Sequence, residues 1–144
     1  MGTQGQTVPP DRTLTGRSFL IVDDDADARH ILRLTLEGRG ARVSDVDSVS
    51  AARELLHESC PDAVLTDVAM PGEDGLTLID WLRNQANPDW TRLPVIAVTA
   101  HASLDVRRWA EASGVAAYLV KPVHPSTLIA TLRDVLRDRG PHTT

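Results

Sequence analysis

The sequence predicts a single α/β domain built around a parallel β-sheet. Five short apolar segments alternate with helical patterns along the chain, which is typical of a parallel sheet covered by helices. Four of these segments are aliphatic and carry few charges, as expected for strands that are buried on both faces. The chain of 144 residues has the length of one ordinary domain and is too short for two.

One of the predicted strands differs from the rest. Residues 41–46, Ala-Arg-Val-Ser-Asp-Val, alternate polar and apolar side chains, so we expect this strand at an edge of the sheet. The other four predicted strands are mainly aliphatic. The five predicted strands are residues 18–22, 41–46, 62–66, 94–99 and 115–120.

The predicted helices fill the segments between the strands and follow the last one. Asp25, Asp74 and Ser126 each precede an apolar periodic run, so we expect them to cap the first, third and last helices. The predicted helices are residues 26–37, 48–57, 74–85, 102–113 and a last helix from Ser126. The inward stripe of the first helix comprises Ala28, Ile31, Leu32, Thr35 and Leu36, and that of the last comprises Leu128, Leu132, Val135 and Leu136.

The remaining segments predict loops and chain ends. Residues 87–93 form the longest interior loop, which we expect to be exposed. Residues 1–17 predict a flexible N-terminal leader and residues 140–144 a short C-terminal tail, which leaves residues 18–139 as the ordered domain.

Composition excludes several classes of protein. Fifteen basic against twenty acidic residues give a net charge of −5, which argues against direct nucleic-acid binding. No apolar run is long enough to span a membrane, residues 1–17 lack the apolar region of a secretory signal, and a single cysteine, Cys60, excludes an internal disulfide. We therefore expect a soluble, cytoplasmic protein. Lys121 is the only lysine, although the chain contains many arginines.

Polar side chains follow four of the five predicted strands. Ligands of open α/β sheets bind at the carboxyl ends of the strands, so these side chains are expected to gather at one edge. The residues at these positions are Asp23 and Asp24 after the first strand, Asp67 after the third, Thr99 at the end of the fourth and Lys121 after the fifth.

This set of side chains suits phosphoryl transfer to a carboxylate. Two carboxylates about 4 Å apart repel each other by roughly 4 kcal/mol at an effective dielectric constant near 20, and a divalent cation removes that cost. Carboxylate, carbonyl and water oxygens favour Mg²⁺ over zinc. Asp67 could then act as the nucleophile, while Lys121 neutralises phosphoryl oxygens and the Thr99 hydroxyl donates a hydrogen bond.

These residues resemble the response-regulator receiver family over about residues 16–139. The match comprises Phe19-Leu-Ile-Val-Asp-Asp24, Arg29, Asp67-x-x-Met-Pro71, Asp74-Gly75, Pro94-x-Ile-x-Val-Thr-Ala100 and Tyr118-x-x-Lys-Pro122, in order and at the family's spacing. The resemblance implies a flavodoxin-like (βα)5 three-layer sandwich with strand order 2-1-3-4-5. It also implies a cis peptide bond between Lys121 and Pro122.

The resemblance further implies roles for individual residues. Asp67 would be the phosphoacceptor and Lys121 the phosphate-binding lysine, while Thr99 and Tyr118 would form the switch. Asp24, Asp67 and the backbone carbonyl of Ala69 would ligate Mg²⁺ directly, and Asp23 would act largely through water.

The expected function is a phosphorylation-controlled switch. A sensor histidine kinase or a histidine phosphotransfer protein would phosphorylate Asp67, and the altered surface would bind a downstream effector protein. The protein would catalyse only its own phosphorylation and dephosphorylation. After Pro122 only 22 residues remain, so we expect no output domain in this chain.

Two other functions remain open at this point. Asp23-Asp24-Asp25 after the first strand also satisfies the Asp-x-Asp spacing of haloacid-dehalogenase-like phosphatases, although that motif's usual Thr or Val is Asp27 here. The chain could also be a pseudo-receiver that serves only for docking. Arg29 has no assigned role and is equally suited to a surface ion pair.

Overall fold

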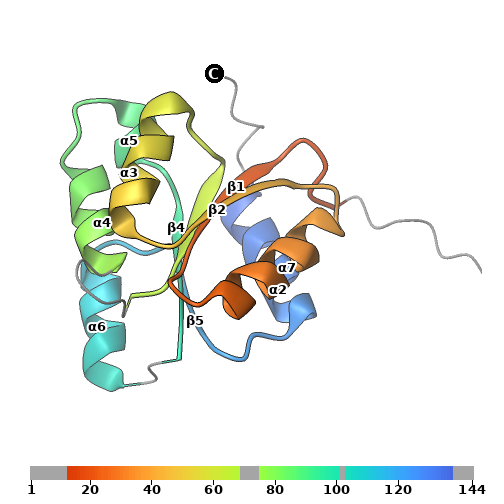
Figure 1. Cartoon of the computed structure of the whole chain (residues 1–144). Helices are drawn as coiled ribbons and strands as arrows, with labels where there is room; N and C mark the ends of the chain where they lie inside the picture. The colour runs from red at the N-terminus through yellow and green to blue at the C-terminus, as the bar shows by residue number, and fades with distance from the viewer. Residues whose placement is uncertain (1–12, 69–74, 101–102, 138–144) are drawn as a thin grey trace, which may run out of the picture.

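The computed structural model describes residues 13–68, 75–100 and 103–137. These form three layers, with one parallel sheet between two layers of helices (Figure 1). The five strands are ordered β2-β1-β3-β4-β5, and all neighbouring pairs are parallel. Both the sheet type and the strand order implied by the resemblance are therefore confirmed. The strands are β1 (Ser18–Val22), β2 (Arg42–Val46), β3 (Ala63–Thr66), β4 (Val95–Thr99) and β5 (Ala117–Val120).

Helices cover both faces of the sheet (Figure 1). On one face, α2 and α7 bury leucines such as Leu36 and Leu132 against alternate strand residues. On the other face, α3, α4 and α6 pack their apolar side chains, such as Leu56 and Ile79, against the intervening strand residues. The helices are α2 (Ala26–Glu37), α3 (Val49–Glu58), α4 (Gly75–Arg83), α5 (Pro88–Thr91), α6 (Leu104–Ala112) and α7 (Pro125–Leu136). None of these helices has both the length and the apolarity needed to cross a membrane.

The first helix agrees with its predicted bounds and cap, but its apolar stripe is narrower than predicted. The Asp25 carboxylate accepts hydrogen bonds from the amides of Asp27 and Ala28, which caps α2 as expected. Leu32 and Leu36 are buried, whereas Ile31 is 62% exposed. The helix lies against β2 at the edge of the sheet and β1, so only one side of it meets the core.

The predicted cap of the last helix is wrong. The helix begins at Pro125, and the His124 ring accepts a hydrogen bond from the Ser126 amide, so His124 and not Ser126 is the N-cap. Proline is favoured at the first helical position because its fixed φ suits the helix and its missing N–H is not needed there. The predicted cap at Asp74 lies outside the described residues.

Two segments predicted as irregular contain ordered structure. Residues 87–93 include the short helix α5, which Asn87 caps and Pro88 begins. At the start of the described chain, the Leu14 amide donates to the Arg39 carbonyl, and the Leu14 side chain is buried among core residues. The prediction that the flexible leader extends to residue 17 is therefore wrong for residues 13–17, which are part of the folded domain. A single apolar residue among polar ones has no periodicity from which its burial could be predicted.

Arg83 joins the end of α4 to two backbone segments beneath β4 and β5. Its guanidinium donates hydrogen bonds to the carbonyl oxygens of Thr91 (3.3 Å), Leu93 (3.0 Å) and Gly114 (3.0 Å). Burial lowers the pKa of Arg83 from its ordinary value. The end of α4 is thereby tied to the loops that lead into β4 and β5.

Gly75 is a close contact between α4 and the end of β3. A Cβ atom on Gly75 would lie 2.2 Å from the Asp67 carbonyl oxygen and 2.8 Å from the Thr66 hydroxyl oxygen. Only a residue without a side chain allows α4 to begin this close to the backbone of Asp67.

We therefore expect Gly75→Ala to destabilise the protein by about 1–3 kcal/mol, because the backbone must shift to admit the methyl group. Urea unfolding followed by circular dichroism measures the change. Gly38→Ala is the control, because Gly38 has a helical φ of −62°. The atom nearest to a Cβ added at Gly38 is the Leu34 carbonyl oxygen, at 3.1 Å. Equal losses of stability in the two variants would contradict the proposed close contact.

Candidate functional site

Backbone hydrogen bonds fix the residues that follow β1, β3 and β5. The Asp23 amide donates to the Val46 carbonyl (3.1 Å), and the Asp67 amide donates to the Val22 carbonyl (2.9 Å). The Lys121 amide donates to the Thr99 carbonyl in the same way (2.8 Å). The sheet ladder thus continues one residue beyond the strands, which places these side chains at one edge.

Three carboxylates meet at this edge. One ligand oxygen from each of Asp23, Asp24 and Asp67 lies within 4.8 Å of the others. Asp23 and Asp67 are buried, whereas Asp24 is exposed. A cluster made only of carboxylate oxygens is a hard donor set, which fits Mg²⁺ and offers no sulfur or imidazole ligand for zinc.

Lys121 reaches into the same cluster. Its Nζ atom donates hydrogen bonds to Asp23 Oδ2 and, at 3.1 Å, to Asp67 Oδ2. Burial alone would lower the pKa of Lys121, but the hydrogen bonds and charges of Asp23 and Asp67 outweigh it and raise the pKa. The ammonium group therefore stays charged and offsets the repulsion between two buried carboxylates.

Further contacts hold Asp23 in place. Its second carboxylate oxygen, Oδ1, accepts a hydrogen bond from the Asp25 amide at 2.9 Å. Its backbone carbonyl accepts a hydrogen bond from the Arg29 guanidinium at 2.6 Å. Arg29 belongs to the matched motif but had no predicted role, because nothing in the sequence indicates which atom its guanidinium contacts.

Thr99 and Tyr118 lie on neighbouring strands near the cluster. Thr99 ends β4 and is fully buried, and Tyr118 on β5 pairs with Ala97, two residues before Thr99. The Arg107 guanidinium on α6 lies over the Tyr118 ring, 5.7 Å from its centroid. Burial raises the pKa of Tyr118; the positive charge of Arg107 acts in the opposite direction, and the negative charge of Asp67 adds to the rise.

The remaining features are the expected ligand Ala69, two tryptophans and the peptide bond before Pro122. Ala69, the expected backbone ligand, lies outside the described residues. Trp81 packs against Trp90 and the His57 ring, with centroid distances of 5.1 and 5.6 Å, which supports a packing role for Trp81. Trp109 on α6 is 65% exposed. The peptide bond between Lys121 and Pro122 is cis, as the resemblance implied.

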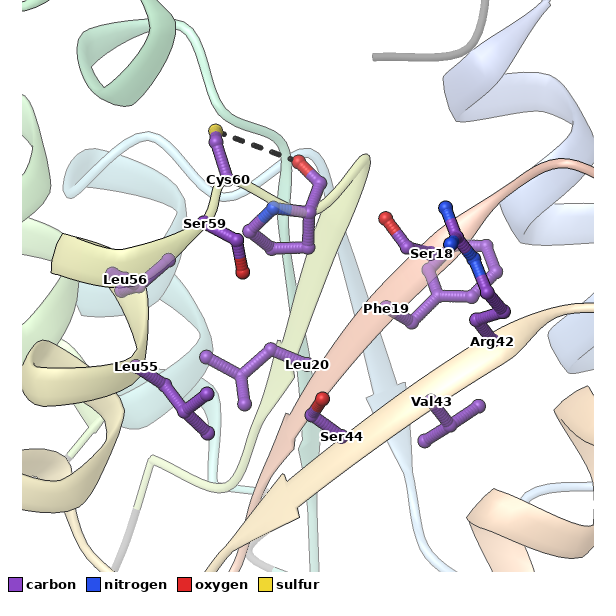
Figure 2. A pocket seen from close by; sticks show the side chains of 11 residues that line it. Ser18, Phe19, Leu20, Arg42, Val43, Ser44, Leu55, Leu56, Ser59 and Cys60 are labelled. Carbon is purple, nitrogen blue, oxygen red and sulfur yellow. Dashed lines mark hydrogen bonds between the residues drawn. The ribbon is translucent and has the colours of Figure 1, made fainter. Parts of the chain in front are cut away.

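A pocket of about 300 Å³ lies away from this cluster, at the opposite ends of β1 and β2 (Figure 2). Leu20, Leu55 and Ser44 line it, and Cys60 lies at its far side with its thiol directed to the Pro61 carbonyl. Burial, with smaller effects of Asp89 and Asp62, raises the pKa of Cys60 to about 11. The thiol is therefore protonated at neutral pH and is not an activated nucleophile.

Comparisons with known proteins agree with the geometry of the cluster. A family model described as the response regulator receiver domain matches residues 19–133. Over 118 residues the chain is 42% identical to an uncharacterized 14.6 kDa protein of Leptolyngbya boryana, covering 82% of this chain and 88% of that protein. Over 129 residues it is 32% identical to the phosphate regulon transcriptional regulatory protein PhoB of Pseudomonas aeruginosa, covering 89% of this chain and 55% of PhoB. The chain therefore spans about half the length of PhoB.

A solved structure supports the same assignment. The chemotaxis response regulator CheY4 of Vibrio cholerae superimposes with a TM-score of 0.76 at 28% identity, covering 83% of this chain and 98% of CheY4. The family match extends from the second residue of β1 into α7 and thus reaches every strand of the sheet. On this evidence the chain belongs to the family of response regulator receiver domains of two-component signalling systems.

Proposed function

We propose that this receiver domain accepts a phosphoryl group on Asp67 from the phosphohistidine of a sensor histidine kinase or a histidine phosphotransfer protein in the cytoplasm. One observation carries the proposal. The carboxylates of Asp23, Asp24 and Asp67 and the ammonium group of Lys121, which come from three separate parts of the chain, meet at one edge of the sheet.

Asp67 is the nucleophile in this reaction. A carboxylate oxygen of Asp67 attacks phosphorus, and an O–P bond forms as the P–N bond to the donor histidine breaks. The electron pair of the broken bond stays on the imidazole nitrogen. With its other ring nitrogen protonated, the donor histidine leaves as neutral imidazole.

The acidic cluster is the proposed Mg²⁺ site. Asp24 and Asp67 are the direct carboxylate ligands, Asp23 acts largely through water, and the Ala69 carbonyl completes the protein's ligands. When bound, Mg²⁺ supplies positive charge that offsets the negative charge of the phosphoryl oxygens. The all-oxygen donor set of the three aspartates supports this choice of metal.

Lys121 and Thr99 bind the phosphoryl oxygens. Lys121 Nζ is 3.1 Å from Asp67 Oδ2, so a short movement brings its charge to a group attached there. The Thr99 hydroxyl, at the end of β4, donates a further hydrogen bond to the phosphorylated Asp67. The cost of burying the added negative charge is reduced by both contacts.

Tyr118 passes the change to a partner surface. Movement of Thr99 toward the phosphoryl group frees space for the Tyr118 ring, which then leaves its contact with Arg107 on α6. The surface formed by α6, β5 and α7 changes shape, and a downstream effector protein binds the altered form. Beyond its own phosphorylation and dephosphorylation, the domain catalyses no reaction in this proposal.

Beryllofluoride with Mg²⁺, which mimics an aspartyl phosphate, is expected to change tryptophan emission in the wild-type protein and not in Asp67→Asn. The change should report on Trp109, which is exposed on α6, and should therefore disappear in Trp109→Phe. Asp25→Asn is the matched control, because it removes a neighbouring carboxylate and keeps a side chain that caps α2. A wild-type protein that does not respond would instead support a docking domain without phosphorylation.

Lys121→Met is expected to lower the free energy of unfolding at neutral pH by about 1–3 kcal/mol, because two buried carboxylates lose their shared cation. Contacts with Asp23 and Asp67 raise the pKa of Lys121 above its ordinary value of 10.5, so the folded protein binds this proton more tightly than the unfolded chain. From neutral pH up to pH 10.5 this stabilisation is therefore complete, and it is lost as the pH rises through the pKa of Lys121 in the folded protein. Urea unfolding of both proteins across this range measures the difference.

Arg137→Met is the control for Lys121→Met, since Arg137 pairs with Asp134 on the exposed surface of α7 and such pairs contribute little. Millimolar Mg²⁺ should restore part of the stability of Lys121→Met by supplying a cation to the same carboxylates. A variant as stable as the wild-type protein at neutral pH would show that the ammonium group does not offset their repulsion.

A further inference from the structure

Arg29 contacts the peptide group between Asp23 and Asp24, and it has no role in the phosphoryl transfer proposed above. It lies in the first turns of α2, and its Nη1 atom donates to the Asp23 carbonyl oxygen at 2.6 Å. That oxygen belongs to the peptide group that joins Asp23 to Asp24. Because a peptide group is planar, holding its oxygen sets the directions in which the chain leaves both residues.

We propose that Arg29 is a positioning residue, which holds the Asp23–Asp24 peptide so that both carboxylates are directed toward Asp67. This inference rests on the proposed metal site at the acidic cluster. Asp23 is then held at three points: its carbonyl by Arg29, and its two carboxylate oxygens by the Asp25 amide and the Lys121 ammonium group.

Arg29 is itself held from the other side. Its Nε atom lies 3.4 Å from Asp45 Oδ2 on β2. The other oxygen of Asp45 accepts a hydrogen bond from Arg33 at 2.8 Å, and Arg33 also pairs with Glu37 at 3.1 Å. The side chains of Arg29 and Asp45 are only 19% and 26% exposed, so their contact is partly shielded from water. The guanidinium thus connects β2, the edge strand, to the Asp23–Asp24 peptide.

Charge and position have opposite effects on metal binding. A cation near three carboxylates repels a divalent cation, so removing the charge of Arg29 should by itself strengthen Mg²⁺ binding. Loss of the hydrogen bond to the Asp23 carbonyl should weaken binding, because the carboxylates are no longer held in place before the metal arrives. The sign of the measured change therefore distinguishes positioning from a purely electrostatic role.

Calorimetric titration with MgCl₂ tests the proposal. Arg29→Met is expected to bind Mg²⁺ about 10- to 100-fold more weakly than the wild-type protein, as is typical when a partner of a metal ligand is lost. Arg33→Met is the matched control, because it removes the same charge one turn along α2. Among the described residues, the Arg33 guanidinium pairs with the same Asp45 and with Glu37, and not with Asp23. We expect Arg33→Met to change the affinity less than about twofold.

Two more variants separate positioning from folding. Arg29→Lys keeps the charge and can still reach one acceptor, so it should recover part of the affinity. Asp45→Asn leaves Arg29 in place but weakens its second contact, so it should shift the affinity in the same direction as Arg29→Met by a smaller factor. Urea unfolding of each variant shows whether the fold is retained.

A measurement without metal keeps this inference separate from the proposed function. The Asp25 amide donates to Asp23 Oδ1 at 2.9 Å, so its hydrogen exchange reports on whether the Asp23 carboxylate is held. Arg29→Met should exchange this amide about tenfold faster than Arg33→Met does. If the wild-type protein binds no Mg²⁺, the proposed function fails, yet faster exchange in Arg29→Met alone still supports positioning.

Three results would overturn the proposal. These are Mg²⁺ binding by Arg29→Met as tight as that of the wild-type protein or tighter, an equal loss in Arg33→Met, and unchanged exchange of the Asp25 amide in Arg29→Met.

Discussion

Repulsion among three aspartates is the constraint on which the rest of this structure depends. Asp23, Asp24 and Asp67 would separate if their backbones were free to move, and two of them are also buried. The sheet prevents this, because ladder hydrogen bonds hold the amides of Asp23 and Asp67 at adjacent strand ends. Lys121 then supplies the charge that makes their proximity tolerable. A stable sheet is therefore a condition for the proximity of the three carboxylates.

Most of the fold could be predicted because strand and helix patterns are local properties of the sequence. The predictions of burial and capping were wrong where the result depends on neighbouring or distant residues. Ile31 fits the helical period, but among the residues that the structure describes no element beyond the edge strand covers that side of α2. Ser126 is a good capping residue, but Pro125 begins the helix earlier and leaves the cap to His124. Leu14 is buried by contacts with distant residues, which no local pattern of the sequence contains.

The proximity of the three aspartates and Lys121 could also be predicted, since each follows a strand and the carboxyl ends of parallel strands share an edge. Which atoms meet could not be predicted. The contact of Lys121 with both Asp23 and Asp67 depends on how far β5 lies from β1 and β3. The hydrogen bond from Arg29 to the Asp23 carbonyl oxygen depends on the angle between α2 and the segment of Asp23 and Asp24 that precedes it. Such distances and angles follow from packing across the whole domain.

The Arg83 contacts imply that the two ends of β4 and β5 are fastened by different kinds of interaction. Beneath these strands, the guanidinium bonds to the carbonyl oxygens of Thr91, Leu93 and Gly114, which are neutral backbone groups. Above them, the Lys121 ammonium group pairs with carboxylates, so opposite charges hold the strands there. A change in the charge of the carboxylates therefore acts directly on the upper end, while the bonds of Arg83 at the lower end do not depend on that charge.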